Sequence, residues 1–311
     1  MTTTTMRALI GGSGAPRLVE VPVPQAGPRQ VRIKVAAAGV NPFDLAVAAG
    51  TLADYGVARR LDSYAIGFDA AGTVDQVGDG AGFRVGEEVI GLDARLELPT
   101  KAQAEYVVLD AEAVARAPRG VSAVAAATIP LNSLTAWQAL DRAGVGPGRT
   151  LLVTGAAGAV GGYLVELAAL RGARVVAVAG AGDEELVRGL GAEWFVARGD
   201  SVASAVRDHV PGGVDAVVDA AVLGLAALDA VRDGGAFVTL SAGVAPVGLR
   251  GIDVATVFFR SDPAQLAEIV RLVEAGRLTL RVAETYPLEK AADAHARLAA
   301  GGVRGRLVLV P

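Results

Sequence analysis

Three glycines recur at every third position in the segment VTGAAGAVGG, residues 153–162. Gly155, Gly158 and Gly161 follow the apolar run Leu151–Val153. A strand that ends at a glycine turn and continues as a helix leaves N–H groups at the helix start, where the helix dipole favours an anion. Glycine also lets the backbone approach a phosphate closely. Taken alone, the spacing fits a phosphate site or close helix packing equally well, so the surrounding elements must decide.

Short apolar strands alternate with helical stretches after Val121, which predicts a parallel sheet. Strands are expected at residues 151–153, 174–179, 194–196, 216–218 and 237–240. The glycine turn therefore follows a strand and opens a helix inside a βαβ unit, the context that a dinucleotide site requires. We expect the pyrophosphate of a cofactor to lie on Gly155, Ala156, Ala157, Gly158, Ala159 and Val160.

The first 118 residues have a different pattern, typical of short antiparallel strands in a barrel. Strands are expected at residues 30–35, 67–77, 88–92 and 105–109, and the uncharged stretch 120–140 is expected to form a buried helix. The tail from Pro263 predicts a helix at 265–274, a strand near 278–282, a helix at 288–300 and a last strand at 305–310. This mixture can return to complete the first domain.

Composition excludes several classes of function. The chain has 311 residues, enough for two domains, and its net charge of −4 argues against nucleic-acid binding. Cysteine is absent, so no thiolate nucleophile and no cysteine-based zinc site is available, and the cytoplasm is the expected compartment. The N-terminus has no apolar signal segment, and we expect no membrane partner. The only histidines, His209 and His295, lack a metal-ligand spacing, so no metal is expected.

The second strand of the parallel sheet bears on which nucleotide is bound. An NAD site places an acid at the tip of that strand to hold the ribose 2′-hydroxyl. Here the strand ends at Ala179 and Gly180, with no acid at either position. Arg188 and Arg198 follow closely enough to pair with a 2′-phosphate, although both are equally well explained as exposed arginines on a helix and in a turn. The pattern favours NADP(H) over NAD.

Tyr286 and Lys290 have the Y-x-x-x-K spacing of short-chain dehydrogenases, in which both residues share one helix face. Pro287 follows Tyr286 directly, which is typical of the first helical position. Tyr286 is therefore expected outside the helix, and we do not favour this interpretation.

Eight segments in a consistent order give the chain a clear resemblance to a known family. It is similar to the zinc-independent quinone oxidoreductase branch of the medium-chain dehydrogenase/reductase superfamily. The matching segments are GVNPFDLAVAAG (39–50), GFDAAGTVDQVGDG (67–80), AEYVV (104–108), IPLNSLTAWQAL (129–140), VTGAAGAVGG (153–162), DAVVDA (215–220), YPLEKAADAHARL (286–298) and GRLVLV (305–310). The resemblance implies an α/β protein with a GroES-like β-barrel domain, residues 1–121 and 260–311, and a doubly wound Rossmann domain for NADP, residues 122–259.

The resemblance also implies roles for individual residues. Asn41 corresponds to an asparagine beside the nicotinamide, although the segment Asn41–Asp44 equally predicts a helix N-cap. Thr135 corresponds to a threonine that approaches the nicotinamide, and Arg188 falls where relatives often have a lysine for the 2′-phosphate. Arg198 falls near a tyrosine that relatives use in the same way, a departure that leaves the role of Arg198 open. The remaining candidate cofactor residues follow strands of the sheet or close over the nicotinamide: Gly180, Ala220, Ala221, Ser241, Ala242, Gly243, Phe258, Phe259 and Arg260.

The implied reaction is hydride transfer from NADPH to a quinone or to the β-carbon of a conjugated carbonyl, with stabilisation of the developing oxygen charge and a proton supplied by a donor or by water. Tyr55 and Tyr64 are candidate donors, and each is as readily explained by packing. An enoyl-thioester reductase remains open because Arg59 and Arg60 could meet a phosphate of the substrate. A nucleotide-binding protein without turnover also remains open.

Relatives of this branch pair through the outer strand of the Rossmann sheet. The matching stretch is residues 252–260, whose apolar side chains are Val254, Val257, Phe258 and Phe259. An apolar sheet edge left open promotes association, and a two-fold pair closes it. We therefore expect a homodimer; the competing interpretation is that the chain's own tail covers this edge.

Overall fold

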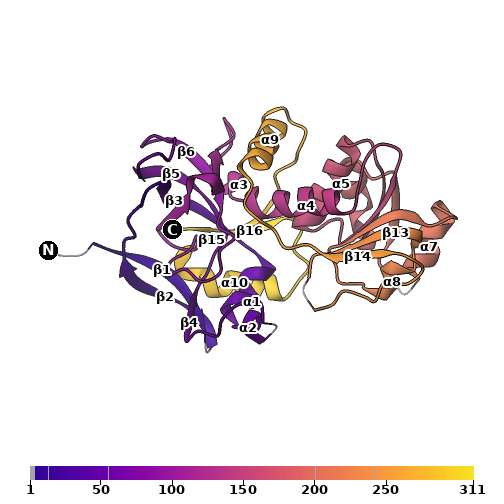
Figure 1. Cartoon of the computed structure of the whole chain (residues 1–311), viewed down its shortest axis with the longest axis horizontal. Coiled ribbons are helices and arrows are strands. Elements are labelled where there is room, and N and C mark those ends of the chain that lie inside the picture. The colour runs from indigo at the N-terminus through magenta and orange to yellow at the C-terminus, as the bar shows by residue number, and fades with distance from the viewer. Residues whose placement is uncertain (1–3, 13, 55, 200, 242) are drawn as a thin grey trace. The chain divides into compact units, whose positions relative to one another are not determined.

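The computed structural model describes residues 4–12, 14–54, 56–199, 201–241 and 243–311. It divides into two compact units (Figure 1). The N-terminal unit comprises Met1–Leu131, Arg260–Gly276 and Leu280–Pro311, and the Rossmann unit comprises Asn132–Phe259 and Arg277–Thr279. Because the tail belongs mainly to the N-terminal unit, that unit is discontinuous in sequence.

Six parallel strands form the sheet of the Rossmann unit, in the order β11-β10-β9-β12-β13-β14. Every strand expected from the sequence is present, and β13 begins earlier than expected, at Val231, which pairs with Val214 before the register shifts. The order reverses between β9 and β12, which is the point where such sheets bind ligands at their carboxyl edge. The bounds are β9 (Thr150–Thr154), β10 (Arg174–Ala179), β11 (Trp194–Ala197), β12 (Val214–Asp219), β13 (Val231–Thr239) and β14 (Asp253–Thr256).

Helices cover this sheet and bury its apolar side chains. Helix α5 packs on β9 and β10, α7 on β11, and α8 on β12 and β13. Val217, Val231 and Phe237 are fully buried in the resulting core, as the near-continuous apolar strands predict. The uncharged stretch 120–140 forms two helices rather than one, with a break at residues 127–129. The bounds are α3 (Ala123–Ala126), α4 (Pro130–Arg142), α5 (Ala159–Leu170), α6 (Glu184–Gly189), α7 (Val202–His209) and α8 (Leu225–Leu228).

The N-terminal unit is built from two mainly antiparallel sheets. One has the order β2-β1-β4, and the other has the order β15-β16-β3-β5-β6-β8, with β7 also pairing with β3. The short helices α1 (Pro42–Ala48) and α2 (Thr51–Asp54) follow β3. The bounds of the strands are β1 (Thr5–Gly12), β2 (Gly14–Pro22), β3 (Gln30–Val40), β4 (Ser63–Ala65), β5 (Asp69–Val77), β6 (Glu88–Leu92), β7 (Tyr106–Asp110) and β8 (Val114–Arg116).

The tail completes the N-terminal unit, as its mixed pattern suggested. Strand β16 (Arg306–Val310) pairs antiparallel with β3 and parallel with β15 (Val282–Pro287). Helix α10 (Ala291–Ala299), yellow in Figure 1, packs on α1, β2 and β16. Helix α9 (Pro263–Glu274) is capped by Asp262, whose side chain accepts a hydrogen bond from the backbone of Gln265.

The strand expected near residues 278–282 is wrong. Thr279 belongs to the Rossmann unit, where its backbone N–H donates to the Glu166 carboxylate at 2.9 Å. The strand begins only at Val282. Tyr286 lies on this strand rather than on a helix, and its hydroxyl donates to Glu284. The short-chain arrangement of Tyr286 and Lys290 on one helix face is therefore absent.

Among the described residues, no helix combines the length and the apolar character needed to cross a lipid bilayer.

The return of the tail gives a test of the fold. Leu307 is fully buried in a core with Leu9, Val40 and Leu288, so we expect Leu307→Ala to lower the free energy of unfolding by about 2–5 kcal/mol. The matched control is Val310→Ala at the half-exposed end of the same strand, which should change it by less than about 1 kcal/mol. Urea unfolding measures both, and equal losses would contradict this packing.

Candidate functional site

The glycine loop connects β9 to α5 at the point where the strand order reverses. Gly155 has φ +63°, a left-handed conformation that glycine adopts without strain. A Cβ on Gly161 would lie 2.0 Å from the carbonyl oxygen of Gly155, so Gly161 is required for the helix to pack against the turn. Gly158 is the N-cap of α5, where it offers no side chain to the helix N-terminus. Gly155 thus serves the turn and Gly161 the packing, while Gly158 leaves the N-terminus of α5 without a side chain.

Ala220 and Ala221, which follow β12, lie against this loop. A Cβ on Gly155 would be 3.2 Å from the Cβ of Ala221 and 3.3 Å from the carbonyl oxygen of Ala220. The structure therefore brings together the glycine loop and the end of the neighbouring strand, as expected for residues at one edge of a parallel sheet. Together with the helix N-terminus, this edge fits the pyrophosphate of a dinucleotide.

Asp219 organises this edge, and the sequence analysis did not single it out. Its buried carboxylate accepts the hydroxyl of Thr154 at 2.5 Å and the backbone N–H groups of Leu223 at 3.1 Å and Gly224 at 2.9 Å. The turn that it holds contains Val222 at φ +57°, a strained conformation for a β-branched residue. An aspartate at the end of an apolar strand was the available signal.

The tip of β10 differs from the expectation. A turn of 3₁₀ helix, Ala181–Asp183, carries Asp183 back so that its carboxylate accepts the N–H of Gly180 at 3.2 Å. The prediction that no carboxylate lies at the tip of β10 is therefore wrong. Neither Ala179 nor Gly180 is an acid, but the folded chain brings the carboxylate of Asp183 to Gly180. A carboxylate here favours a ribose hydroxyl and repels a 2′-phosphate.

The two arginines near this tip are placed differently. The backbone N–H of Arg198 donates to the carbonyl of Ala179 at 2.7 Å, which puts Arg198 beside the tip with its side chain exposed. Arg188 lies on α6, where it forms an ion pair with Glu184 at 2.8 Å and donates to the carbonyl of Glu193 at 3.0 Å. Of the two, Arg198 is the better placed to meet a phosphate.

The remaining predicted cofactor residues are spread over the structure. Thr135 is buried on α4. Ser241 follows β13, where its N–H donates to the hydroxyl of Thr239 at 3.2 Å, and Gly243 is exposed at φ +75°. After β14, Phe258 is half-exposed, Phe259 is partly buried and Arg260 pairs with Asp262 at 3.3 Å. Ala242 lies outside the described residues.

A buried polar cluster lies in the N-terminal unit around Asn41. Asn41 Nδ2 donates to Asp44 Oδ2 at 3.1 Å and to Asp69 Oδ2 at 2.8 Å, and Asp69 Oδ1 accepts the N–H of Leu131 at the start of α4. Gln103 Nε2 donates to Asp44 Oδ2 at 3.2 Å. Asn41, Asp44, Asp69 and Gln103 are fully buried.

Asn41 is the N-cap of α1, as predicted, with Pro42 at the first helical position and Asp44 in the first turn, but its side-chain oxygen accepts no hydrogen bond from the helix. Asp44 accepts the backbone N–H of Asn41 at 2.6 Å. The side-chain amide of Asn41 is turned toward the carboxyl groups of Asp44 and Asp69. Both Nδ2 hydrogens are thus engaged, while Asn41 Oδ1 is buried without a hydrogen-bond partner. The Asn41 side chain therefore has no free donor, and its one group without a partner is the acceptor Oδ1.

Burial shifts the pKa values of this cluster. Desolvation is the main cause that raises the pKa of Asp44 to about 7, and the charge of Asp69 adds to it. Desolvation also raises the pKa of Asp69, which the Arg306 guanidinium opposes. His295 accompanies them: its Nε2 lies 2.9 Å from Gln103 Oε1, and desolvation lowers its pKa to about 4. His295 is therefore a buried, neutral residue of α10.

Of the two tyrosines considered as proton donors, only Tyr64 is described. Its hydroxyl donates to the carbonyl of Arg59 at 3.1 Å and accepts the N–H of Leu61 at 2.9 Å. These bonds fasten the loop that contains Arg59 to β4. Tyr55 lies outside the described residues.

Comparisons with known proteins place this architecture in a family. Residues 27–119 match the family described as "Alcohol dehydrogenase GroES-like domain", and residues 190–309 match "Zinc-binding dehydrogenase". The solved structure of an NAD-dependent alcohol dehydrogenase is 32% identical, with a TM-score of 0.86 over 98% of this chain and 100% of that chain. This chain belongs to the medium-chain dehydrogenase/reductase superfamily.

Named relatives in the superfamily differ in what they reduce. The chain is 31% identical to the 2-methylene-furan-3-one reductase of Solanum lycopersicum, over 79% of this chain and 63% of the relative, which is less than two thirds of its length. It is 28% identical to the chloroplast envelope quinone oxidoreductase homolog of Arabidopsis thaliana, over 97% of this chain and 95% of the relative. It is also 34% identical to the spectinabilin polyketide synthase system protein NorB of Streptomyces orinoci, over 96% of this chain but only 14% of the relative.

Zinc does not fit the residues present, although zinc appears in the family description. Phe68 and Asp69 stand where zinc-dependent members of the superfamily carry a G-H-E segment, and the sequence contains no cysteine. Within the described ranges, no three His, Cys, Asp or Glu side chains gather as metal ligands would. These observations fit the zinc-independent branch of the superfamily.

A buried lysine, Lys101, lies against the ring of Phe68. Lys101 Nζ is 4.0 Å from the centroid of the Phe68 ring and donates to the carbonyl of Asp93 at 3.1 Å and to that of Arg95. Desolvation lowers the pKa of Lys101 to about 8. Because the ammonium is held by carbonyls and a ring face, Lys101 fastens the segment 93–101 to Phe68, the residue before β5.

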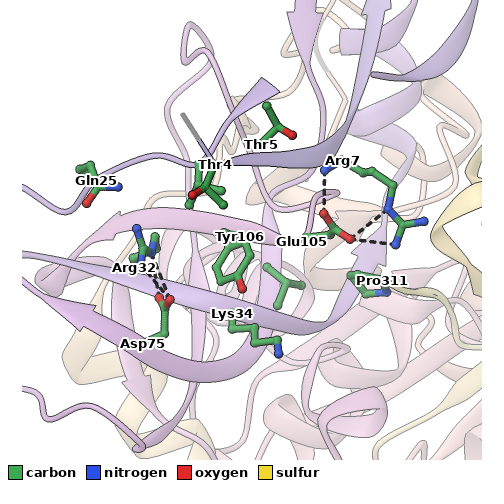
Figure 2. Close-up of a pocket in the computed structure, with 12 residues that line it drawn as sticks. Thr4, Thr5, Arg7, Gln25, Arg32, Lys34, Asp75, Glu105, Tyr106 and Pro311 are labelled. Atoms are coloured by element: carbon green, nitrogen blue, oxygen red, sulfur yellow. Dashed lines mark hydrogen bonds and ion pairs between the residues drawn. The ribbon is translucent and has the colours of Figure 1, made fainter. Parts of the chain in front are cut away.

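A cavity of about 680 Å³ in the N-terminal unit is shown in Figure 2. None of the predicted site residues lines it. Arg7 pairs with Glu105 at 2.8 Å and Arg32 pairs with Asp75 at 2.9 Å, so carboxylates neutralise both arginines. This cavity is therefore not the candidate dinucleotide site.

Two substitutions in the glycine loop distinguish a role in cofactor binding, expected for Gly158, from a role in helix packing, expected for Gly161. We expect Gly158→Val to fold and to lose NADPH binding, because the branched side chain would occupy the position of the pyrophosphate. Gly161→Val is the matched control and should destabilise the fold, because its Cβ would overlap the Gly155 carbonyl. Circular dichroism and fluorescence titration separate the outcomes, and normal NADPH affinity of Gly158→Val would show that the loop serves packing only.

The buried histidine predicts a pH dependence. Because the pKa of His295 is lower in the folded protein, about 4, than its ordinary value of 6.5, the unfolded chain binds the proton more tightly. Stability relative to His295→Gln should therefore rise with pH between about 4 and 6.5, by about 1.4 kcal/mol per pH unit. Urea unfolding of both proteins across this range measures the difference, and a difference independent of pH would contradict the burial of a neutral His295.

Proposed function

We propose that the protein is an NADPH-dependent, zinc-free oxidoreductase that reduces a quinone or an α,β-unsaturated carbonyl compound. The observation that carries the proposal is the glycine loop at the reversal of strand order, where Gly155, the N-terminus of α5 and Ala221 form an edge that fits a dinucleotide. When bound, the reduced nicotinamide supplies a hydride.

The named relatives support this substrate class. The tomato relative is named for a ketone conjugated to an exocyclic double bond, and the Arabidopsis relative is named for quinones. Both kinds of substrate accept a hydride and then a proton. Since the Tyr64 hydroxyl is engaged within its own loop, the structure favours water over Tyr64 as the source of that proton.

Asn41 has a defined part in this proposal. Its carbonyl oxygen accepts a hydrogen bond from a hydroxyl or amide of the cofactor or substrate, because both of its amide hydrogens are held by Asp44 and Asp69. Asn41 therefore orients a ligand and does not stabilise a developing oxyanion, which requires a donor.

An enoyl-thioester reductase is the second candidate, supported by the similarity to the polyketide synthase protein. The two arginines that suggested a phosphate contact give it little support. Arg59 pairs with Glu97 at 2.6 Å and Arg60 pairs with Asp54, so neither cation is reserved for a ligand.

A substrate panel tests the function. The purified protein is given NADPH with quinones, enones and enoyl-CoA thioesters, and the loss of NADPH absorbance is followed. We expect turnover with a quinone or an enone. Turnover with the thioesters alone would favour the second candidate, and binding of NADPH without any turnover would indicate a nucleotide-binding protein. Elemental analysis after chelator treatment should find no stoichiometric zinc.

The cofactor preference rests on two opposing charges at the tip of β10. We propose that the cofactor is NADP(H) and that Arg198 pairs with its 2′-phosphate. The carboxylate of Asp183 keeps its hydrogen bond to the N–H of Gly180. Arg198→Ala should weaken NADPH binding by about 1–3 kcal/mol and leave NADH unchanged. Arg188→Ala, whose guanidinium is held by Glu184, is the control and should have a smaller effect. Fluorescence titrations decide, and NADH binding equal to or tighter than NADPH would refute the preference.

We also propose a homodimer, formed through the edge strand β14 with its neighbouring apolar residues. β14 is at the end of the sheet order, and Val254, Val257 and Phe259 are only partly buried within the unit. A sheet edge of this kind is a template for pairing. Light scattering at tens of micromolar should give twice the monomer mass, and Val257→Lys should reduce it; a monomeric wild type would exclude the dimer. The lack of cysteine supports the cytoplasm as the compartment.

A further inference from the structure

The two oxygens of the Asp44 carboxyl have opposite environments. Asp44 Oδ2 accepts three hydrogen bonds: from the backbone N–H of Asn41 at 2.6 Å, from Asn41 Nδ2 at 3.1 Å and from Gln103 Nε2 at 3.2 Å. Asp44 Oδ1 is equally buried and accepts none from the described residues. A carboxylate shares its charge over both oxygens, whereas a carboxylic acid has one carbonyl oxygen that accepts and one hydroxyl that donates. The asymmetry at Asp44 matches the acid.

Asn41 shows the complementary pattern. Its two Nδ2 hydrogens are engaged by Asp44 and Asp69, and its Oδ1 is a buried acceptor without a partner. An amide in the reversed orientation would set Oδ1 against carboxyl oxygens of both aspartates, so the orientation is fixed. The cluster therefore contains one buried oxygen, Asn41 Oδ1, that lacks a hydrogen-bond donor. It also contains a carboxyl oxygen, Asp44 Oδ1, that accepts no hydrogen bond.

The charges around the pair also favour a proton. One nitrogen, Asn41 Nδ2, contacts both Asp44 and Asp69, so the two carboxyls lie within about 6 Å of each other. Arg306 on β16 is the cation that acts on both, while His295 on α10 reaches Asp44 only through Gln103 and is neutral. Lys101 is a more distant charge, held by backbone carbonyls. A second buried negative charge here would share Arg306 with Asp69 and would otherwise be offset only by Lys101, whose ammonium is bonded to backbone carbonyls.

We propose that Asp44 carries a proton on Oδ1 in the folded protein at pH 6 and donates it to Asn41 Oδ1. This bond and the observed bond from Asn41 Nδ2 to Asp44 Oδ2 together close an acid–amide ring. Each polar atom of the pair is then satisfied, in keeping with the rule that buried polar groups are hydrogen-bonded. Asp44 is a positioning residue: it fixes the orientation of the Asn41 amide.

The raised pKa of Asp44, about 7, agrees with this protonation state. Desolvation raises the pKa of Asp69 as well, but the hydrogen bonds of Asp69 differ from those of Asp44, because its two oxygens accept from Asn41 Nδ2 and from the N–H of Leu131, as an ionised carboxylate does. The protonation of Asp44 does not depend on the proposed function; only the ligand contact of Asn41 does.

The test uses the isostere of a protonated aspartate. An amide at position 44 presents one acceptor and one donor in the same places as the acid, so Asp44→Asn should keep the ring, and its urea midpoint at pH 6 should match or exceed that of the wild type. Asp44→Ala should unfold at a clearly lower urea concentration. Asp69→Asn is the matched control and should also be destabilised, because it sets one amide nitrogen against another or loses the bond to Leu131.

Infrared spectroscopy gives a second readout that a purely structural role would not produce. The wild type at pH 6 should show a carbonyl stretch of a protonated carboxylic acid in the folded state that disappears as the pH is raised to 9, and Asp44→Asn should lack this component between pH 6 and 9. Neither measurement requires a cofactor or turnover, so a failed substrate panel would leave this proposal intact. A wild-type spectrum without that band, or an Asp44→Asn protein as unstable as Asp44→Ala, would overturn it.

Discussion

One side-chain nitrogen, Asn41 Nδ2, holds two buried carboxyls together, and four elements meet around that contact. Asp44 fixes the start of α1, and Asp69 fixes the start of α4 through Leu131. Gln103 joins the cluster to α10 through His295, and Arg306 brings the last strand to it by donating to the carbonyl of Val40 at 2.7 Å. A polar network this deep is stable only when its members are satisfied, so it imposes a single arrangement on segments far apart in the sequence.

The carboxyl edge of the parallel sheet follows a different rule. There the backbone must come close to a ligand, so glycine and alanine replace larger side chains, and one aspartate holds the turn that they form. Asp219 connects β9 to the turn after β12 through Thr154 and three backbone N–H groups. The strained conformation of Val222 is located in this turn, where backbone bonds to a single carboxylate keep it in place.

The order of the elements and the glycine loop could be predicted because both are written in short-range patterns: apolar strands, glycine spacing and turn residues. The candidate site could be predicted only in part. The sequence shows Asp183 three residues beyond the strand tip, but only the 3₁₀ turn brings its carboxylate back to Gly180. Likewise, residue types predicted Asn41 as the N-cap of α1, but not the hydrogen bond from its side chain to Asp69, which is 28 positions away. The strand expected near 278–282 was misplaced because the contact between Thr279 and Glu166 is equally non-local.

The environment of Lys101 has a practical consequence for labelling. Lysine occurs only at positions 34, 101 and 290. Lys101 is almost completely buried beneath the face of Phe68, whereas Lys34 and Lys290 are exposed. Amine-reactive dyes, biotin reagents and cross-linkers will therefore attach at the two exposed lysines, both in the N-terminal unit. The Rossmann unit contains no lysine, so chemistry directed at amines can immobilise or tag this protein without touching the glycine loop.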